Sequence, residues 1–493
     1  GTDGEPGGRP AGSAAGSDGE PGGLPAGLVR ALRQGLPKVG PGPLLSALGA
    51  LRVRAEDRTG RRRVFFPGGE VTRALAVPER RPPLPARHVT QAVALLEAEL
   101  LRRFAAAGER GARGQGQGDP DGGDVGGGGL GGGGVDGGRG GGAYELAVLD
   151  TDLADLTVPF TERATARALV AVPRGSRRPV PEGEVLRMFL HWTEPEGNRT
   201  DLDLSVAFFD ADWGFAGLCD YTHLRFGEDA AVHSGDLTSA PAPDGATEYV
   251  DLDPARLAAH GVRYAVPLVL SFNNVPFDQL TDAFAGFMAL PAHGPRGASY
   301  DPRTVRQRFD LAGASRICLP MVVDLAERQA LWTDVHLPPA EGFQSVAAMG
   351  PRLGEVVRDV HEQFGARSRV TLWDLTVWRA AVRTREVAVL RRAREPGAAD
   401  ELWTFRRAAD EPAAAFADRI ARLTEPDLRV PGGDPEAGAA RLASGKRVFL
   451  ATVHGGPAPD RATGTVYRLF PATAAYGPGF REVTAGELVA ELG

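Results

Sequence analysis

The chain has 493 residues, of which 42% are hydrophobic, and its 56 basic and 63 acidic side chains give a net charge of −7, so its length implies about three domains that each bury a core. Two cysteines, Cys219 and Cys318, are too few for a disulfide scaffold or a four-cysteine zinc site, and they favour a reducing cytoplasm. The acidic balance argues against nucleic-acid binding, and no apolar run reaches the roughly 18 residues of a membrane span.

The first part of the chain alternates between low-complexity and helical segments. Residues 1–27 are rich in glycine and proline and contain the near-repeat DGEPGGRPAG and DGEPGGLPAG, which predicts a disordered tail. Residues 28–107 are predicted to form a helical region that includes a basic stretch at 58–63 and a short strand at 64–66. Its clearest helix is predicted over 84–107, where apolar residues repeat on one face. These residues are Val93, Leu96, Leu100 and Phe104.

The remaining chain divides into three predicted segments. The glycine-rich residues 108–143 are predicted to be a flexible linker. Residues 144–340 contain short alternating apolar runs separated by turns, which predict a central antiparallel β-sandwich, with the runs at 146–160 leading into it. Residues 341–493 are predicted to be a mixed α/β region that begins with a helix at 345–364. The predicted fold class is therefore α+β.

The densest group of acidic residues lies inside the predicted sandwich. In the segment TDLDLSV at 200–206, the two-residue period of a strand places Asp201 and Asp203 on one face and Leu202 and Leu204 on the other. Two carboxylates on one face repel each other, and a hard cation bound by oxygen atoms would neutralise them. The alternative is a solvated strand face followed by aspartate-rich turns. The segment is not an EF-hand loop, because Val206 stands where a glycine is required.

The order of several motifs resembles that of the TerD-type domain, which is found in bacterial tellurium-resistance and stress-response proteins. The motifs are His191-Trp192, TDLDLSVAFFDAD at 200–212, HSGD at 233–236, VDL at 250–252, DAF at 282–284 and FDL at 309–311. The resemblance covers about a third of the chain. It implies a calcium-binding β-sandwich whose ions are held in loops at one end.

By this resemblance, Asp201, Asp203 and Asp236 are the expected calcium ligands, with Asp244 and Glu248 as weaker candidates. The chain lacks several oxygen-bearing residues that the family places at 221–224, at 237 and before the VDL strand. The sequence therefore leaves three alternatives for calcium binding, which are one site, a weakened pair of sites, or no binding.

Three short segments resemble a larger actinobacterial and myxobacterial architecture that contains a TerD-like region. They are the N-terminal helix, DLTVPF at 155–160 and VTLWDL at 370–375. Some proteins of this architecture carry an upstream RING-type zinc domain, and the two cysteines of this chain cannot form one.

The sequence therefore predicts a cytoplasmic, non-catalytic, calcium-responsive binding or signalling module of a stress-response protein, which presents a surface to an unidentified protein partner. The alternative is an ion-free scaffold whose helices at 84–107 and 345–364 contact other proteins. A hydrolase that uses magnesium or manganese at the acidic cluster is a third hypothesis, which lacks a nucleophile and a base. Neither a GxSxG motif nor a P-loop occurs, and both cysteines are expected to be buried thiols.

Overall fold

A computed structural model describes residues 23–66, 75–113, 144–159, 172–288, 290, 305–311, 313–337, 346–365, 368–394, 397–431, 433–469 and 476–493. The predicted tail up to residue 22, most of the predicted linker (114–143) and the part of the predicted sandwich at 160–171 lie outside these residues. The described residues contain both helices and strand sheets, as the α+β prediction requires. No helix within these ranges combines the length and apolar character needed to cross a membrane.

The N-terminal region contains helices and one small hairpin. Its elements are α1 (Ala26–Gly35), η1 (Leu36–Lys38), α2 (Pro41–Arg52), β1 (Arg62–Phe65), β2 (Leu75–Pro78) and α3 (Ala86–Arg113). The helix α2 begins at a proline, whose fixed backbone angle suits the first helical turn. The helix α3 begins two residues after the start of the helix predicted over 84–107 and extends beyond its end, and its Leu96, Leu100 and Phe104 are buried.

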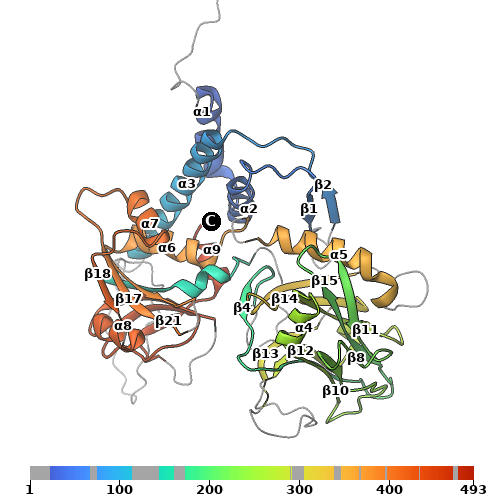
Figure 1. The fold of residues 1–493 in the computed structure, drawn as a ribbon. Helices are drawn as coiled ribbons and strands as arrows, with labels where there is room; N and C mark the ends of the chain where they lie inside the picture. Colours follow the sequence, from blue (N-terminus) through green and yellow to red (C-terminus); the bar gives the residue numbers. More distant parts are fainter. Residues whose placement is uncertain are drawn as a thin grey trace, which may run out of the picture.

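Two six-stranded antiparallel sheets follow, with the strand orders β13-β12-β5-β10-β9-β8 and β4-β15-β14-β11-β6-β7. They form one half of the molecule in Figure 1, coloured from teal to yellow. Their strands are β4 (Arg177–Pro179), β5 (Leu186–Thr193), β6 (Leu202–Phe209), β7 (Phe215–Cys219), β8 (Arg225–Phe226), β9 (Ala231–His233), β10 (Ala246–Leu252), β11 (Tyr264–Ser271), β12 (Asp282–Met288), β13 (Val305–Asp310), β14 (Ile317–Asp324) and β15 (Gln329–His336). The short helices α4 (Pro254–Ala259) and η3 (Phe277–Gln279) connect them.

The alternation of side chains along the strands explains how the two sheets pack. In β6, Leu202, Leu204 and Phe208 contribute to a hydrophobic cluster that also contains Leu190 and Trp192 of the other sheet. The opposite face of β6 belongs to a second cluster, which the helix α5 (Val346–Gln363) completes. Figure 1 shows α5 lying across this sheet. The helix predicted at 345–364 therefore packs on the sheet that contains β6, although the sequence grouped it with the C-terminal region.

His361, near the end of α5, is enclosed by aromatic rings. Its ring centroid lies 5.3 Å from that of Trp213 and 5.5 Å from that of Tyr264. Burial, followed by the charge of Arg177, lowers the pKa of His361 to about 4. Between pH 6.5 and 4 the unfolded chain therefore binds a proton at this histidine that the folded chain does not bind. The contribution of His361 to the free energy of unfolding is fully present above pH 6.5, and it is lost as the pH falls from 6.5 to 4.

We expect acidification from pH 6.5 to 4 to lower the free energy of unfolding by up to about 3 kcal/mol through His361 alone. Urea unfolding at several pH values, compared between the wild type and His361→Phe, measures this contribution. The variant keeps the aromatic contacts and lacks the titrating group, so its stability should fall less over the same window. Parallel pH profiles for the two proteins would contradict the assignment.

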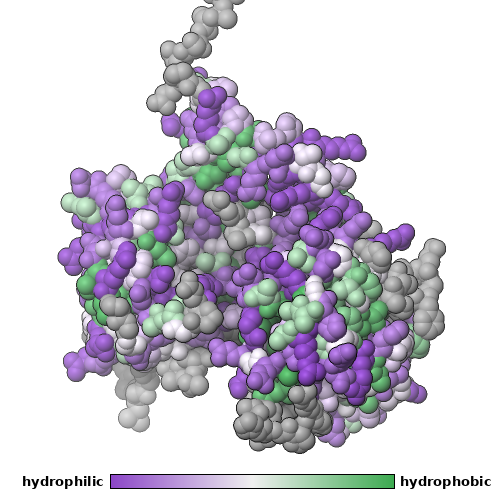
Figure 2. Space-filling model, viewed as in Figure 1, coloured by the Kyte–Doolittle hydropathy of each residue, from purple (hydrophilic) through white to green (hydrophobic). Residues whose placement is uncertain are grey.

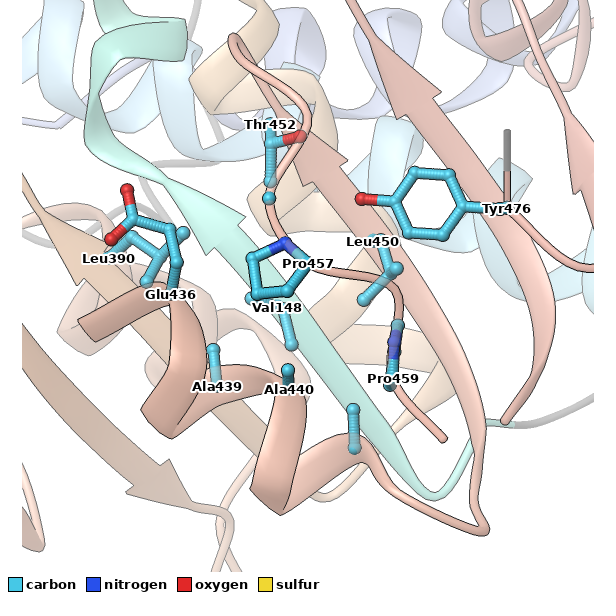
Figure 3. A pocket seen from close by; sticks show the side chains of 12 residues that line it. Val148, Leu390, Glu436, Ala439, Ala440, Leu450, Thr452, Pro457, Pro459 and Tyr476 are labelled. Carbon is cyan, nitrogen blue, oxygen red and sulfur yellow. The ribbon is translucent and has the colours of Figure 1, made fainter. Parts of the chain in front are cut away.

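The third sheet is seven-stranded, with the order β18-β17-β16-β3-β19-β20-β21. Its strands are β3 (Leu146–Asp150), β16 (Glu386–Arg391), β17 (Glu401–Arg406), β18 (Leu428–Pro431), β19 (Arg447–Thr452), β20 (Thr463–Arg468) and β21 (Phe480–Glu482). The helices η2 (Thr151–Asp155), α6 (Leu372–Arg383), α7 (Ala413–Ala421), α8 (Pro435–Ala443) and α9 (Ala485–Ala490) accompany it. Residues of α2, α3, α6 and α7 share one cluster with this sheet, and α8 joins another, whose small pocket is shown in Figure 3.

The strand β3 lies in the centre of this third sheet, where it pairs in parallel with β16 and β19. The sequence instead placed its residues within the segment 144–340 that leads into the antiparallel sheets. All five residues of β3 are buried, so its short apolar run has no alternation from which to infer its neighbours. The antiparallel sheets are therefore inserted, along the chain, between β3 and α6.

The two chain segments that enter and leave this insertion are bonded to each other. Thr157 and Thr371 form an antiparallel bridge. The Leu372 amide donates to the Leu156 carbonyl at 2.8 Å, and the Val158 amide donates to the Val370 carbonyl at 3.1 Å. Residues 156–158 of the DLTVPF segment and residues 370–372 of the VTLWDL segment, which the same resemblance names, are therefore paired where the chain passes between the third sheet and the inserted sheets.

Candidate functional site

Three of the five predicted ligands converge at one end of the antiparallel sheets. Oxygen atoms of Asp201, Asp203 and Asp236 all lie within 4.8 Å of one another. Asp201 and Asp203 flank the first residue of β6, and Asp236 lies in the loop after β9. We call these three residues the carboxylate cluster. The sequence predicted all three members of the cluster, two from the strand period and the third from the family resemblance.

The cluster lies beside a gap in strand pairing. The edge strand β7 pairs with β6 only from Val206 onward, so the first part of β6 has no β7 neighbour. Side chains of the other sheet satisfy this exposed backbone instead. The Leu204 amide donates to Glu248 Oε2 at 2.8 Å, and His233 Nε2 donates to the Leu204 carbonyl at 2.9 Å. The two sheets are thus joined by hydrogen bonds next to the cluster.

The same two side chains hold the loop that carries Asp236. The Gly235 amide donates to His233 Nδ1 at 3.0 Å, and the Leu237 amide donates to Glu248 Oε1 at 3.0 Å. Burial lowers the pKa of His233, which favours the neutral ring that these two bonds require. Asp236 is therefore held between two tethered residues, opposite the start of β6.

The carboxylate cluster concentrates negative charge in a partly buried place. Asp203 is 4% exposed, and its pKa is raised to about 7 by burial and by the charges of Asp201, Asp236 and Asp220. The pKa of Asp201 is raised by burial and by Asp236. These shifts show that the folded chain opposes ionisation of the cluster when no cation is present.

No basic side chain neutralises this charge within the described residues. Asp203 accepts no hydrogen bond there, and Asp201 Oδ1 is buried without a donor. Burial and the charge of Asp236 outweigh the lowering effect of Arg199 on the pKa of Asp201, and the Arg199 guanidinium binds the Thr238 carbonyl at 2.8 Å. A set of carboxylate oxygens without a basic partner matches the donor preference of a hard divalent cation.

The other two predicted ligands have different positions. Asp244 is exposed in the turn before β10 and is not part of the cluster. Glu248 is fully buried, and both of its oxygens accept backbone amides, as described above. Burial raises the pKa of Glu248 to about 8. Glu248 thus positions the loop of Asp236 and is not available as a free ligand.

Two neighbours of the cluster were not predicted as part of the site. Asp220 is buried, and its Oδ1 accepts the amides of Thr222 and His223 at 2.9 and 2.7 Å. The pKa of Tyr221 is raised by burial and by the charges of Asp203 and Asp220. Residues 221–224, which include Tyr221, depart from the family pattern. Asp220 directly follows β7, and this position at the end of a predicted strand was the feature of the sequence that could have placed it near the site.

A second group of metal-ligating atoms within 4.8 Å of one another consists of Cys318, Asp334 and His336. Asp334 Oδ2 already accepts from Arg174 at 3.2 Å. Both cysteines are buried free thiols, as predicted, and burial raises the pKa of the Cys318 thiol well above its usual value. This mixed sulfur, nitrogen and oxygen set does not suit a hard cation.

No protein-family model and no curated protein matches the chain. Solved structures with partial similarity include SAV2460, a protein of unknown function with 19% sequence identity and a TM-score of 0.25, over 35% of this chain and 96% of that chain. Another is SCO6318 from Streptomyces coelicolor A3(2), a homologue of the telluride resistance protein TerD, with 12% identity and a TM-score of 0.26, over 35% of this chain and 97% of that chain.

Proposed function

We propose that the two antiparallel sheets form a TerD-like β-sandwich that binds calcium at Asp201, Asp203 and Asp236 and acts without catalysis. The observation that carries this proposal is the convergence of the three carboxylates, whose oxygens lie within 4.8 Å of one another. In this view the chain is a cytoplasmic module of the stress-response type, and calcium changes the surface that it presents to a protein partner.

Calcium fits the cluster because of the charge left unbalanced there. Within the described residues, Asp203 is buried and accepts no hydrogen bond, and Asp201 Oδ1 is a buried oxygen that no donor reaches. A divalent ion would balance these charges and supply the missing bonds. Since Asp244 and Glu248 are placed elsewhere, the residues described here support one site of this kind and not an intact pair.

The alternative of an ion-free scaffold has less support. It relied on the apolar faces of the helices at 84–107 and 345–364. In α3, Leu96 and Leu100 pack into the core shared with the third sheet, and in α5, Leu353 and Val357 pack against the antiparallel sheet. The face of the molecule in Figure 2 is mostly hydrophilic, with hydrophobic residues in small groups. These helices therefore stabilise the chain itself.

We expect calcium to raise the melting temperature of the wild type and to have no effect on Asp203→Asn. Binding to the folded state alone adds about 2.7 kcal/mol of stability at a calcium concentration of 100 times Kd. Because the variant lacks one of the opposed charges, its melting temperature without calcium should exceed that of the wild type. Thermal melts with and without millimolar calcium, together with titration calorimetry, measure both effects.

Asp212→Asn is the matched control, because Asp212 follows the same strand, is exposed and lies outside the cluster. Its response to calcium should equal that of the wild type. The proposal fails if the wild type shows neither heat of binding nor a shifted melting temperature. It also fails if Asp203→Asn responds to calcium as the wild type does.

A further inference from the structure

The strands β14 and β15 carry a second set of side chains with metal-ligating atoms. A sulfur, an oxygen and a nitrogen atom of Cys318, Asp334 and His336 lie within 4.8 Å of one another. We call these residues the Cys-Asp-His group. It belongs to the same sheet as Asp203 and shares no residue with the carboxylate cluster. The strand β11 lies between β14 and β6, so two strand spacings, about 10 Å, separate the two groups across the sheet.

The register of the sheet places two of the three side chains on one face. Cys318 stands directly opposite His336 in the pairing of β14 with β15. Directly opposed residues of an antiparallel pair project to the same face, with Cβ atoms about 4.5–5.5 Å apart. Both side chains are buried, and Cys318 belongs to the hydrophobic cluster between the two sheets. The thiol and the imidazole therefore meet beside this core.

An irregularity in β15 brings the carboxylate to the same place. The pairing of β14 with β15 shifts there, so that Thr333 and Asp334 stand opposite Pro320 alone. Proline has no amide hydrogen to donate, which weakens the ladder at this point. Asp334 has a φ of 43°, in the left-handed region that residues other than glycine seldom adopt. Bulges of this kind redirect a side chain, and here the carboxylate lies next to the thiol and the imidazole.

Arg174 fixes this carboxylate and leaves one of its oxygens near the imidazole. Arg174 Nη2 donates to Asp334 Oδ2 at 3.2 Å and to the Asp334 carbonyl at 3.1 Å. The other oxygen, Oδ1, lies 3.6 Å from His336 Nε2. This separation is too long for a hydrogen bond. It is close to the spacing of about 3.3–3.6 Å that two ligands of one tetrahedral zinc ion would have, given metal–ligand bonds of about 2.0–2.3 Å.

The imidazole has no hydrogen-bond partner at the atom that faces the carboxylate. His336 is 7% exposed, and its Nε2 is buried without a hydrogen bond in the described part of the chain. A buried polar nitrogen without a partner is uncommon in folded proteins and costs free energy. The ring is confined, because the Phe277 ring lies edge-on to it at 6.2 Å between centroids, and a Cβ atom added to Gly313 would lie 3.1 Å from its Cε1. The fold thus holds an available nitrogen ligand in place.

The charges of the group allow it to take up a divalent cation. Asp334 is paired with Arg174, and burial, followed by the charge of Asp334, raises the pKa of the Cys318 thiol, which favours its protonated form. When a metal binds, the thiol releases this proton to solvent and becomes an anionic ligand. The thiolate and the carboxylate then balance the two positive charges of the ion, and the neutral imidazole adds a third bond.

We propose that Cys318, Asp334 and His336 bind one zinc ion. Zinc accepts sulfur, nitrogen and oxygen ligands together, whereas calcium and magnesium prefer oxygen alone. Three protein ligands leave a fourth position for water, and the Asp334 side chain is 31% exposed, so the ion can enter from that side. Such an ion would bridge β14 and β15 where their pairing is irregular. It would be distinct in position and in chemistry from an ion at the carboxylate cluster.

The test is titration of the full chain, free of metal and with reduced thiols, with cobalt, which occupies zinc sites and gives an absorption band through its bond to a thiolate. We expect one such cobalt ion per chain, displaced by zinc and unaffected by excess calcium. The titration is repeated in Asp203→Asn and should give the same band, so the result does not depend on whether the carboxylate cluster binds calcium. Absence of the band in the wild type overturns the proposal.

Cys318→Ala and Cys219→Ala form a matched pair of variants. The chain has two cysteines, and both are fully buried, so each variant loses one sulfur atom from the core. The cobalt–thiolate band should disappear in Cys318→Ala and persist in Cys219→Ala. The reverse pattern, or the same band in both variants, overturns the assignment to Cys318.

Asp334→Asn and His336→Gln keep the test decisive if Cys318→Ala does not fold. Asp334 is partly exposed, and asparagine tolerates the left-handed backbone there. We expect each substitution to weaken zinc binding at least about tenfold, measured by competition with a coloured chelator, because even the loss of a residue that only orients a ligand costs this much. Asp212→Asn is the control, since Asp212 is exposed and lies outside both groups. Zinc affinities of Asp334→Asn and His336→Gln equal to that of Asp212→Asn would overturn the proposal.

Discussion

Replacing Arg392 with methionine is expected to lower the free energy of unfolding by about 3–5 kcal/mol, because it leaves a buried carboxylate without its partner. Arg392 follows β16, and its guanidinium binds both oxygens of Asp150, at 3.1 and 2.8 Å. Asp150 is fully buried at the end of β3. The same guanidinium binds Asp400 at 2.8 Å and also contacts Glu436.

Urea unfolding followed by circular dichroism measures this loss. The matched control is Arg391→Met, the preceding arginine, which is 41% exposed and pairs with Glu401 at 3.3 Å. An exposed pair of this kind contributes about 1 kcal/mol at most. The double variant Arg392→Met, Asp150→Asn should recover part of the loss. Equal losses in the two single variants would show that the ion pair with Asp150 is not what stabilises β3.

The two-residue period of a strand was sufficient to place part of the site. It put Asp201 and Asp203 on the face opposite Leu202 and Leu204, and the structure has these leucines in the inner core. Asp236 is distant from them along the chain, so spacing alone gave no reason to group it with them. The family resemblance supplied that link. The strand period also aligns Glu248 with the core residues of β10. This alignment indicated that Glu248 is buried and hydrogen-bonded within the fold, and that it is not a ligand in a loop.

Other features depend on contacts that no local pattern encodes. The strand β3 is buried on both faces, and its neighbours β16 and β19 lie far along the chain. The bridge between Thr157 and Thr371 likewise joins two segments that are far apart in the sequence. The sequence therefore specified the strands and the chemistry of single segments, while the assembly of distant segments required the structure.

Trp192 belongs to the hydrophobic core and also contacts the backbone next to the carboxylate cluster. Its side chain is fully buried in the hydrophobic cluster between the two antiparallel sheets. Its indole Nε1 donates to the Thr200 carbonyl at 2.9 Å, one residue before Asp201. We expect Trp192→Ala to lower the free energy of unfolding by about 3–5 kcal/mol, through lost contacts and the cavity that remains.

Trp192→Phe separates packing from positioning. It keeps an aromatic ring and loses the bond to Thr200, so we expect a loss of about 1–2 kcal/mol in stability and weaker calcium binding, because Asp201 is then less firmly held. Trp332→Phe is the control, since Trp332 belongs to the same hydrophobic cluster and is stacked on Phe309. It should lose stability and keep the calcium affinity of the wild type. If calorimetry gives both phenylalanine variants the same affinity, Trp192 does not position Asp201, and its role is confined to the core.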